Sequence, residues 1–218
     1  WLRPACRGHR CRPWGEATRG SGSTPGRVYH RRMPPAGLFL TPGAGSNRDQ
    51  AGLVALEERL SPLPVERMDF AYRTAARPFP DRAPKLVDEV CAGVAAMASG
   101  MGVESSALVL GGRSMGGRIC SMAVAGGLPA AGLVLICYPL HPARKPEKLR
   151  VEHFPDIEVP CLFVSGDRDE FGSPDEFAEH LPAISGPVTT VWVPGKRHDL
   201  RNAEADVCDA VEGWLAGL

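Results

Sequence analysis

The stretch ALVLGGRSMGGRICSM, from Ala107 to Met122, decides the fold of this chain. It begins with an apolar run typical of a buried strand, turns through glycines around one serine, and continues with small and apolar residues. A strand that turns sharply into a helix needs glycine where a Cβ would collide, and a serine at the apex projects into a cleft. We therefore interpret residues 112–116, GRSMG, as a nucleophile elbow with Ser114 as the candidate nucleophile.

Short apolar runs alternate with amphipathic stretches of helical spacing from Gly37 onward. This alternation is typical of an α/β fold with a mostly parallel, doubly wound sheet and helices on both faces. The expected strands are 38–41, 65–70, 107–111, 132–138, 161–165 and 188–193. The expected helices are 48–60, 83–99, 115–125, 174–181 and 202–215.

The composition is that of an ordinary globular protein, with 44% hydrophobic and 23% charged residues. No apolar run is long enough to span a bilayer. Residues 1–32 hold eight arginines and one glutamate, so the remaining 186 residues carry a net charge of −7 within a formal total of zero. Proteins that read nucleic acid usually present a basic stripe on the folded part. We expect neither a nucleic acid nor a membrane as partner.

The segment 1–35 is rich in Arg, Gly, Pro and Ser and contains almost no aliphatic residues. Such a segment cannot bury enough apolar surface to offset the entropy of ordering it. We predict that 1–35 is disordered and that 36–218 is one α/β domain. The segment lacks the apolar stretch of a secretory signal, which leaves an Arg-rich transit peptide and an artefactual gene start as the two interpretations.

The chain contains seven cysteines, an odd number. Cys120, Cys137 and Cys161 lie in apolar stretches, where a thiol behaves as a small buried hydrophobic group. We expect reduced thiols and a cytoplasmic location. Cys6 and Cys11, with a histidine between them, resemble half of a zinc site, but no second ligand pair completes it. We predict no metal and no cofactor.

A serine hydroxyl becomes a useful nucleophile when a histidine takes its proton and a carboxylate orients that histidine. The strand CLFVS runs into Gly166-Asp-Arg-Asp, which places Asp167, Asp169 or both at the carboxyl edge of the sheet. The strand VTTVWV runs into a loop that contains His198. We predict Ser114, Asp169 and His198 as the catalytic residues; Asp167 is the alternative acid.

Acyl transfer also needs two hydrogen-bond donors directed at the developing oxyanion. One is normally the amide that follows the nucleophile, which here belongs to Met115. The other should come from the glycine-flanked loop after the first strand, LFLTPGAGSNRD. We predict the Ala44 amide for this role, with Gly43 as the second choice and as a possible substrate-binding residue.

The segment between strands 132–138 and 161–165 spans about twenty residues, too few for a cap domain. This segment supplies several cations, and Arg113 lies beside the nucleophile. These cations form either a solvated face or a site for a small anionic acyl substrate. The cations of the segment are Arg144, Lys145, Lys148 and Arg150. His141 either lines the pocket mouth or is a loop histidine with satisfied hydrogen bonds.

These residues resemble the α/β-hydrolase superfamily. More narrowly, the chain resembles a branch of predicted hydrolases often labelled dienelactone-hydrolase-like, whose animal relatives include a testis-expressed protein and a chromatin-complex subunit. The resemblance is carried by GGRSMGGR (111–118), AGLVLICYPLHP (131–142), VPCLFVSGDRDEFG (159–172), GAG (43–45) and HDL (198–200). It implies Ser114 as nucleophile, Asp169 as acid and His198 as base.

The chain departs from that branch at 41–43, Thr-Pro-Gly, where members usually read His-Gly. It carries a serine where true dienelactone hydrolases have a cysteine, so we do not predict dienelactone chemistry. The expected activity is hydrolysis of a carboxylic ester or thioester of a small molecule through an acyl-enzyme on Ser114. The alternatives are a non-catalytic interaction module with the same fold and an acyltransferase with the same three residues. The sequence does not determine the oligomeric state.

Overall fold

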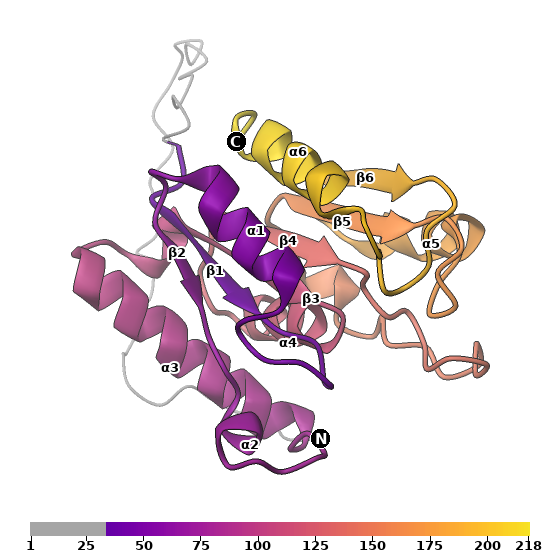
Figure 1. Cartoon of the computed structure of the whole chain (residues 1–218), viewed down its shortest axis with the longest axis horizontal. Coiled ribbons are helices and arrows are strands. Elements are labelled where there is room, and N and C mark those ends of the chain that lie inside the picture. Colours follow the sequence, from indigo (N-terminus) through magenta and orange to yellow (C-terminus); the bar gives the residue numbers. More distant parts are fainter. Residues whose placement is uncertain (1–33) are drawn as a thin grey trace, which may run out of the picture. The chain divides into compact units, whose positions relative to one another are not determined.

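A computed structural model describes residues 34–218 and shows one sheet of six parallel strands (Figure 1). The strand order is β2-β1-β3-β4-β5-β6, and every neighbouring pair is parallel. The strands are β1 Gly37–Thr41, β2 Val65–Arg67, β3 Leu108–Arg113, β4 Gly132–Ile136, β5 Cys161–Gly166 and β6 Val188–Val193. The expectations for Cys6, Cys11 and nearly all of segment 1–35 lie outside the described residues.

Helices cover both faces of the sheet, as the doubly wound α/β prediction requires (Figure 1). One core contains buried residues of α1 and α6, and the other contains buried residues of α3, α4 and α5. This is the architecture of the α/β-hydrolase fold, with no cap domain between β4 and β5. The helices are α1 Ala51–Leu60, α2 Ala71–Thr74, α3 Ala83–Met101, α4 Met115–Ala125, α5 Pro174–His180 and α6 Glu204–Leu215.

The strands in the middle of the sheet are the continuously apolar ones. Every residue of β1, β4 and β5 is buried, because helices pack against both faces of these strands. The edge strands β2 and β6 each contain partly exposed and exposed residues. The apolar runs GLVLIC and CLFVS therefore predicted the central strands correctly.

Several expected boundaries were wrong by a few residues, for local reasons. The strand expected over 65–70 ends at Arg67, and the chain then enters the short helix α2, which was not predicted. The strand expected over 132–138 ends at Ile136, because Cys137 adopts a positive φ of 50°. The strand expected to end at residue 111 continues through Arg113.

Two helices begin later than expected. The helix expected from residue 48 begins at Ala51, because the Arg48 and Asp49 amides bond to side chains of the preceding loop and of Asp69. The helix expected from residue 202 begins at Glu204, since Leu200 and Asn202 have positive φ values of 45° and 56°. Such values are incompatible with a right-handed helix.

The strand order reverses between β1 and β3. From β1 the chain passes to β2 on one side, and the later strands then continue on the other side, beginning with β3. In open α/β sheets, ligands bind in the crevice outside the carboxyl ends of the strands at such a reversal. The loop after β1 and the elbow after β3 both lie at this crevice.

No helix in the part of the chain that the structure describes is both long and apolar enough to cross a membrane. The cytoplasmic location stays a prediction.

Candidate active site

Ser114 occupies a strained turn between β3 and α4. Its φ of 53° and ψ of −117° are unusual for a residue that has a Cβ, and it is the N-cap of α4. Its amide donates a hydrogen bond of 2.8 Å to the Ile136 carbonyl, which ties the turn to β4. Backbone strain of this kind persists only where the surrounding structure enforces it.

The glycines around Ser114 are needed because the elbow packs directly on the end of β1. Gly112 has a φ of 156°, and a Cβ there would collide with the carbonyl and hydroxyl oxygens of Thr41. A Cβ on Gly116 would lie 2.5 Å from the Thr41 carbonyl oxygen. The Thr41 hydroxyl donates to the Gly111 carbonyl at 3.1 Å, so this buried threonine is tied into the elbow.

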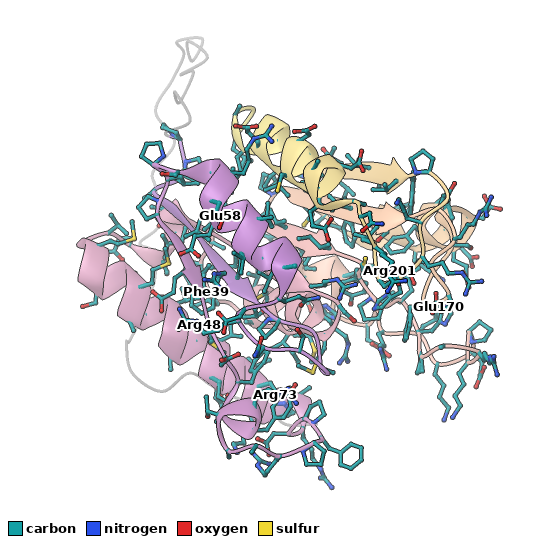
Figure 2. All side chains as sticks on the ribbon, viewed as in Figure 1. Phe39, Arg48, Glu58, Arg73, Glu170 and Arg201 are labelled. Atoms are coloured by element: carbon teal, nitrogen blue, oxygen red, sulfur yellow. The ribbon has the colours of Figure 1, made fainter. Side chains whose placement is uncertain are left out.

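The loops after β5 and β6 lie at the same end of the sheet as the elbow, and Glu170 and Arg201 mark them in Figure 2. The first loop supplies two aspartates with different partners. Asp169 accepts a hydrogen bond from the Phe171 amide at 2.8 Å and faces His198. Asp167 accepts from the Gly195 amide at 2.6 Å and thus joins the two loops. The structure therefore brings Asp169, and not Asp167, to the histidine.

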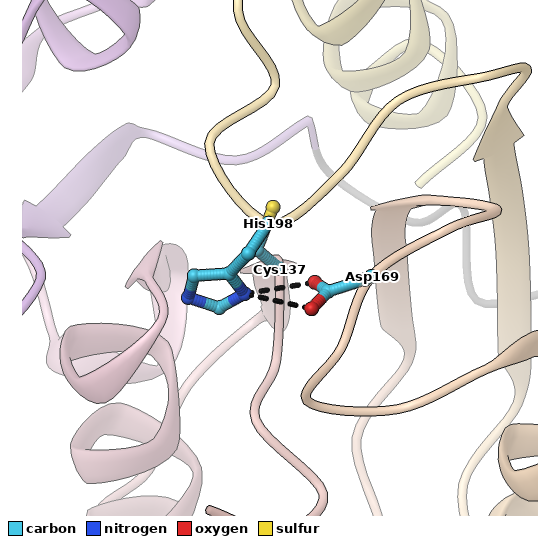
Figure 3. Close-up of side chains that lie close together, drawn as sticks. All are labelled: Cys137, Asp169 and His198. Atoms are coloured by element: carbon cyan, nitrogen blue, oxygen red, sulfur yellow. Dashed lines mark hydrogen bonds and ion pairs between the residues drawn. The ribbon is translucent and has the colours of Figure 1, made fainter. Parts of the chain in front are cut away.

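His198 connects the serine to the carboxylate. Its Nδ1 lies 2.8 Å and 3.0 Å from the two carboxylate oxygens of Asp169, as Figure 3 shows. Its Nε2 lies 2.9 Å from the Ser114 hydroxyl oxygen. Since Nδ1 faces only acceptors here, we assign the proton to Nδ1, which leaves the Nε2 lone pair to accept from the serine hydroxyl.

The Asp169 carboxylate is more deeply buried than the His198 imidazole. The Asp169 side chain is 1% exposed and the His198 side chain 17% exposed. The Phe171 ring covers the imidazole, with ring centroids 4.1 Å apart. A hydrogen bond between a buried carboxylate and an imidazole is stronger than the same bond in water, because the local dielectric is low. The arrangement suits a histidine that must gain and lose a proton without changing its orientation.

The expected oxyanion donors lie on two sides of the serine. Met115 is the first residue of α4, and Gly43 approaches so closely that a Cβ on it would lie 3.7 Å from the Ser114 Cβ. The Ala44 carbonyl accepts a hydrogen bond of 2.7 Å from the Tyr72 hydroxyl, which holds this loop in place. The backbone hydrogen bonds of the described residues leave the Ala44 and Met115 amides without an acceptor.

A pocket of about 600 Å³ opens over Ser114. The loop after β1, the elbow, α4, the segment between β4 and β5, and the His198 loop all contribute to its wall. Its volume suits a small-molecule substrate. The lining residues include Gly43, Ala44, Met115, Phe171 and His198.

Two residues that the sequence suggested for substrate binding have other partners. Arg113 lines the pocket, but its Nη2 donates to the His198 carbonyl at 2.6 Å, and its other guanidinium nitrogens face the Gln50 amide. Arg113 therefore holds the histidine loop against the elbow. His141 is buried, with its ring nitrogens bonded to the Pro142 carbonyl and to Glu176, and it does not line this pocket.

Cys137 lies beside the histidine and the carboxylate, as Figure 3 shows. Possible ligand atoms of Cys137, Asp169 and His198 lie within 4.8 Å of one another, the spacing of a potential metal site. The thiolate is the form that binds metals, and burial raises the pKa of the Cys137 thiol to about 12. Nδ1 and both carboxylate oxygens are already hydrogen-bonded to each other. These contacts favour the aspartate–histidine pair over a metal site.

Sequence reasoning missed three residues of this site, namely Cys137, Phe171 and Arg118. Cys137 was expected inside a strand, and nothing in the sequence marks the positive φ that turns it toward the histidine. Phe171 follows Asp169 by two positions, which is the only sequence signal for its contact. Arg118 follows Ser114 by four positions, and this helical spacing could have placed it on the same side of α4.

The fold and the site together define the class of this protein as an α/β hydrolase. The family described as the alpha/beta hydrolase domain matches residues 34–212, and the chain belongs to this family. The resemblance inferred from the elbow and the loops after the strands is therefore confirmed at the level of the superfamily.

Solved structures share the fold at low sequence identity. An alpha-beta serine hydrolase homologue from Coxiella burnetii aligns with a TM-score of 0.66 at 18% identity, over 84% of this chain and 87% of that chain. Est1E from Butyrivibrio proteoclasticus aligns with a TM-score of 0.65 at 16% identity, over 86% and 90%. A dienelactone hydrolase from Anabaena variabilis aligns with a TM-score of 0.65 at 16% identity, over 84% and 87%.

Proposed function

We propose that this protein is a serine hydrolase that cleaves a carboxylic ester or thioester of a small molecule through an acyl-enzyme on Ser114. One observation carries the proposal. Hydrogen bonds of 2.9 Å and 2.8 Å join the His198 imidazole to the Ser114 hydroxyl and to the Asp169 carboxylate. Ser114 and His198 line the pocket, and the carboxylate is buried behind the histidine. A continuous series of hydrogen bonds thus links nucleophile, base and orienting carboxylate, which is the arrangement that acyl transfer through a serine requires.

The first half of the reaction forms the acyl-enzyme. The Ser114 oxygen attacks the acyl carbon while His198 Nε2 takes the hydroxyl proton, and Asp169 stabilises the imidazolium through Nδ1. The amides of Met115 and Ala44, with Gly43 as the second choice, donate hydrogen bonds to the developing oxyanion. The imidazolium then gives its proton to the departing alkoxide or thiolate as the carbon–oxygen or carbon–sulfur bond breaks.

The second half hydrolyses the acyl-enzyme. A water molecule takes the place of the leaving group, His198 removes its proton, and the resulting tetrahedral intermediate collapses. The serine oxygen recovers its proton from His198, and the carboxylic acid leaves. Every proton in this scheme passes through Nε2, which is why the Nδ1 contact with Asp169 must hold the ring in place.

Labelling with a fluorophosphonate probe tests the proposal, because such probes react with activated serines. We expect labelling of the wild-type protein and its loss in Ser114→Ala. Ser121→Ala is the matched control, since Ser121 is also a serine of α4 and also contacts a histidine. That variant should still be labelled. If folded wild-type protein is not labelled, the proposal is wrong and a non-catalytic module is favoured.

A burst of 4-nitrophenolate from an activated ester would demonstrate the acyl-enzyme directly. The product analysis also separates hydrolysis from acyl transfer. A free carboxylic acid in water supports the proposal, whereas a product found only when an alcohol or thiol acceptor is present would replace hydrolase by acyltransferase.

A further inference from the structure

Two arginines with no catalytic role assigned above reach the pocket over Ser114. Arg118 lies on α4, four residues after the nucleophile, and Arg150 belongs to the segment between β4 and β5. Both residues are partly buried, and both line the same pocket as Ser114 and His198. Two elements far apart in the sequence thus each contribute an arginine to the wall of one pocket.

No carboxylate neutralises this pair. Among the described residues, none lies within 4.0 Å of the Arg118 or the Arg150 guanidinium, whereas Arg59, Arg67 and Arg77 each contact one or two carboxylates. The Nε of Arg118 is shielded from solvent and has no hydrogen-bond partner in the described part of the chain. A buried donor without an acceptor costs free energy, which an incoming anion would recover.

The positive charge of the pair is poorly offset by its surroundings. Burial lowers the pKa of Arg150, and the positive charge of Arg118 lowers it further, which shows that the two cations act on each other. Burial, and next Arg118, also lower the pKa of His153 to about 4, so this neighbour is neutral at pH 7. The carboxylate that opposes these effects on Arg150 belongs to Glu152, an exposed side chain outside ion-pair distance.

The other cations near the site do not share these properties. Arg113 is already bonded to the His198 carbonyl and faces Gln50. Arg144, Lys145 and Lys148 are exposed and do not line the pocket. The sequence alone offered these four cations and Arg150 as candidates for an anionic substrate. The structure retains Arg150 from that set and adds Arg118, which the sequence analysis did not single out.

We infer that Arg118 and Arg150 bind a negatively charged group, a carboxylate or a phosphonate-like oxyanion, on the acyl part of the substrate. The inference rests on the proposed function and specifies its substrate class: the acyl chain carries a second acidic group, set back from the ester or thioester that Ser114 attacks. Guanidinium groups bind carboxylate and phosphate oxygens through paired, charge-assisted hydrogen bonds. The spacing between Ser114 and Arg118 is one helical turn, a rise of about 6 Å.

Three esters test the inference. The neutral ester is 4-nitrophenyl hexanoate. The carboxylate-bearing ester is the 4-nitrophenyl monoester of adipic acid, and the phosphonate-bearing ester is the 4-nitrophenyl ester of 6-phosphonohexanoic acid. We expect kcat/KM for at least one acidic ester to exceed that for the hexanoate by about tenfold or more, as charge-assisted hydrogen bonds predict. The better of the two acidic esters identifies the source of the oxyanion. Equal values for all three, or a preference for the neutral ester, would overturn the inference.

Variants assign the preference to the pair. Arg118→Met and Arg150→Met keep an apolar stem and remove the charge, and each should lower the ratio of acidic to neutral kcat/KM by about tenfold. Lys148→Met is the matched control, because Lys148 is an exposed cation of the same segment and lies outside the pocket. It should keep the wild-type ratio. A ratio that survives in both arginine variants would contradict the assignment.

A binding measurement separates this inference from the proposed function. Adipate and inorganic phosphate are titrated calorimetrically into Ser114→Ala, where no turnover occurs. Binding that weakens in the added Arg118→Met or Arg150→Met background supports the anion site. If the wild-type protein hydrolyses the neutral ester and is labelled at Ser114, but neither anion binds, only the anion site is refuted. If an anion binds while labelling and hydrolysis are absent, only the hydrolase is refuted.

Discussion

Helix α4 carries two serine–histidine pairs with nearly equal distances and different surroundings. Ser114, at its N-terminus, lies 2.9 Å from Nε2 of His198. Ser121, two turns later, lies 2.8 Å from Nε2 of His153. By distance alone the two pairs are equivalent. Only the first one also has access to a pocket and a carboxylate on the far ring nitrogen.

The second pair is arranged for stability. Ser121 is fully buried, and its hydroxyl donates to the Arg118 carbonyl at 2.8 Å. A hydroxyl has one proton, so His153 must donate to Ser121 and cannot act as its base. Burial and the charge of Arg118 keep His153 neutral at pH 7. The comparison shows that a nucleophile is defined by proton direction, an orienting carboxylate and access, and not by a short serine–histidine distance.

The largest effect is expected from exchanging each serine for alanine. Ser114→Ala should lower kcat/KM for 4-nitrophenyl hexanoate by about 10⁴-fold or more, as in other serine enzymes. Ser121→Ala should change it by less than about twofold, because Ser121 is buried and does not line the pocket over Ser114. Equal losses of kcat/KM in the two variants would contradict this comparison, because the serine–histidine distance is the property that the two pairs share.

The orienting carboxylate gives the next largest effect. Asp169→Asn should lower kcat/KM by about 10³- to 10⁴-fold, because an amide favours the wrong tautomer of His198. Asp167→Asn is the matched control on the same loop, since the Asp167 carboxylate accepts from the Gly195 amide while His198 bonds to Asp169. It should cost activity no more than a few-fold. A larger loss in Asp167→Asn would reassign the acid.

A third prediction concerns stability against pH for the buried pair. The pKa of His153 lies near 4 in the folded protein and near 6.5 in the unfolded chain, so the unfolded chain binds the proton first as the pH falls. The stabilisation that depends on a neutral His153 is therefore fully present above pH 6.5. As the pH falls from 6.5 to 4, the free energy of unfolding should decrease by up to about 3 kcal/mol. Urea denaturation of wild type and His153→Gln over this range measures it. A variant with the same pH slope as the wild type would contradict the assignment.

The smallest effect is the stability cost of removing the buried hydroxyl. Ser121→Ala leaves the His153 Nε2 proton without its acceptor in a buried place, which should lower the free energy of unfolding by about 1–2 kcal/mol. Ser114→Ala should cost less or even stabilise, because functional residues are often strained in the native state. Thermal denaturation of the two variants compares them, and the reverse order would be evidence against this account.

The sequence predicted the central elements well and the edges less well. Continuous apolar runs such as 132–136 and 161–165 have no alternative to burial on both faces, so their position in the sheet follows from hydrophobicity alone. The length of the edge strand β2 was overestimated, because apolar Met68 and Phe70 extend the run in the sequence. In the structure the strand ends at Arg67, and helix α2 begins at Ala71. Strand and helix ends depend on local hydrogen bonds, such as that from the Arg48 amide to Asp69, and composition carries no record of them.

The candidate site was likewise predictable in part from the sequence. The elbow at Ser114 and the order serine, aspartate, histidine follow from motif and strand order, because parallel strands deliver their carboxyl ends to one edge of the sheet. Which aspartate turns toward the histidine, and which arginines keep a free guanidinium, follows from loop conformation. Asp167 and Asp169 differ by two positions in one turn, and their side chains take different partners.

The sequence by itself determined that strands and helices alternate, that a glycine-flanked serine ends β3, and that an acid and a histidine follow later strands. Only the tertiary structure decided that Asp169 holds His198, that Arg113 is occupied and that Arg118 and Arg150 share the pocket. The physical reason is the distance along the sequence over which each kind of interaction acts. Periodicity and turn chemistry act over a few residues, whereas the direction of a loop side chain is set by groups distant in the chain that pack against it.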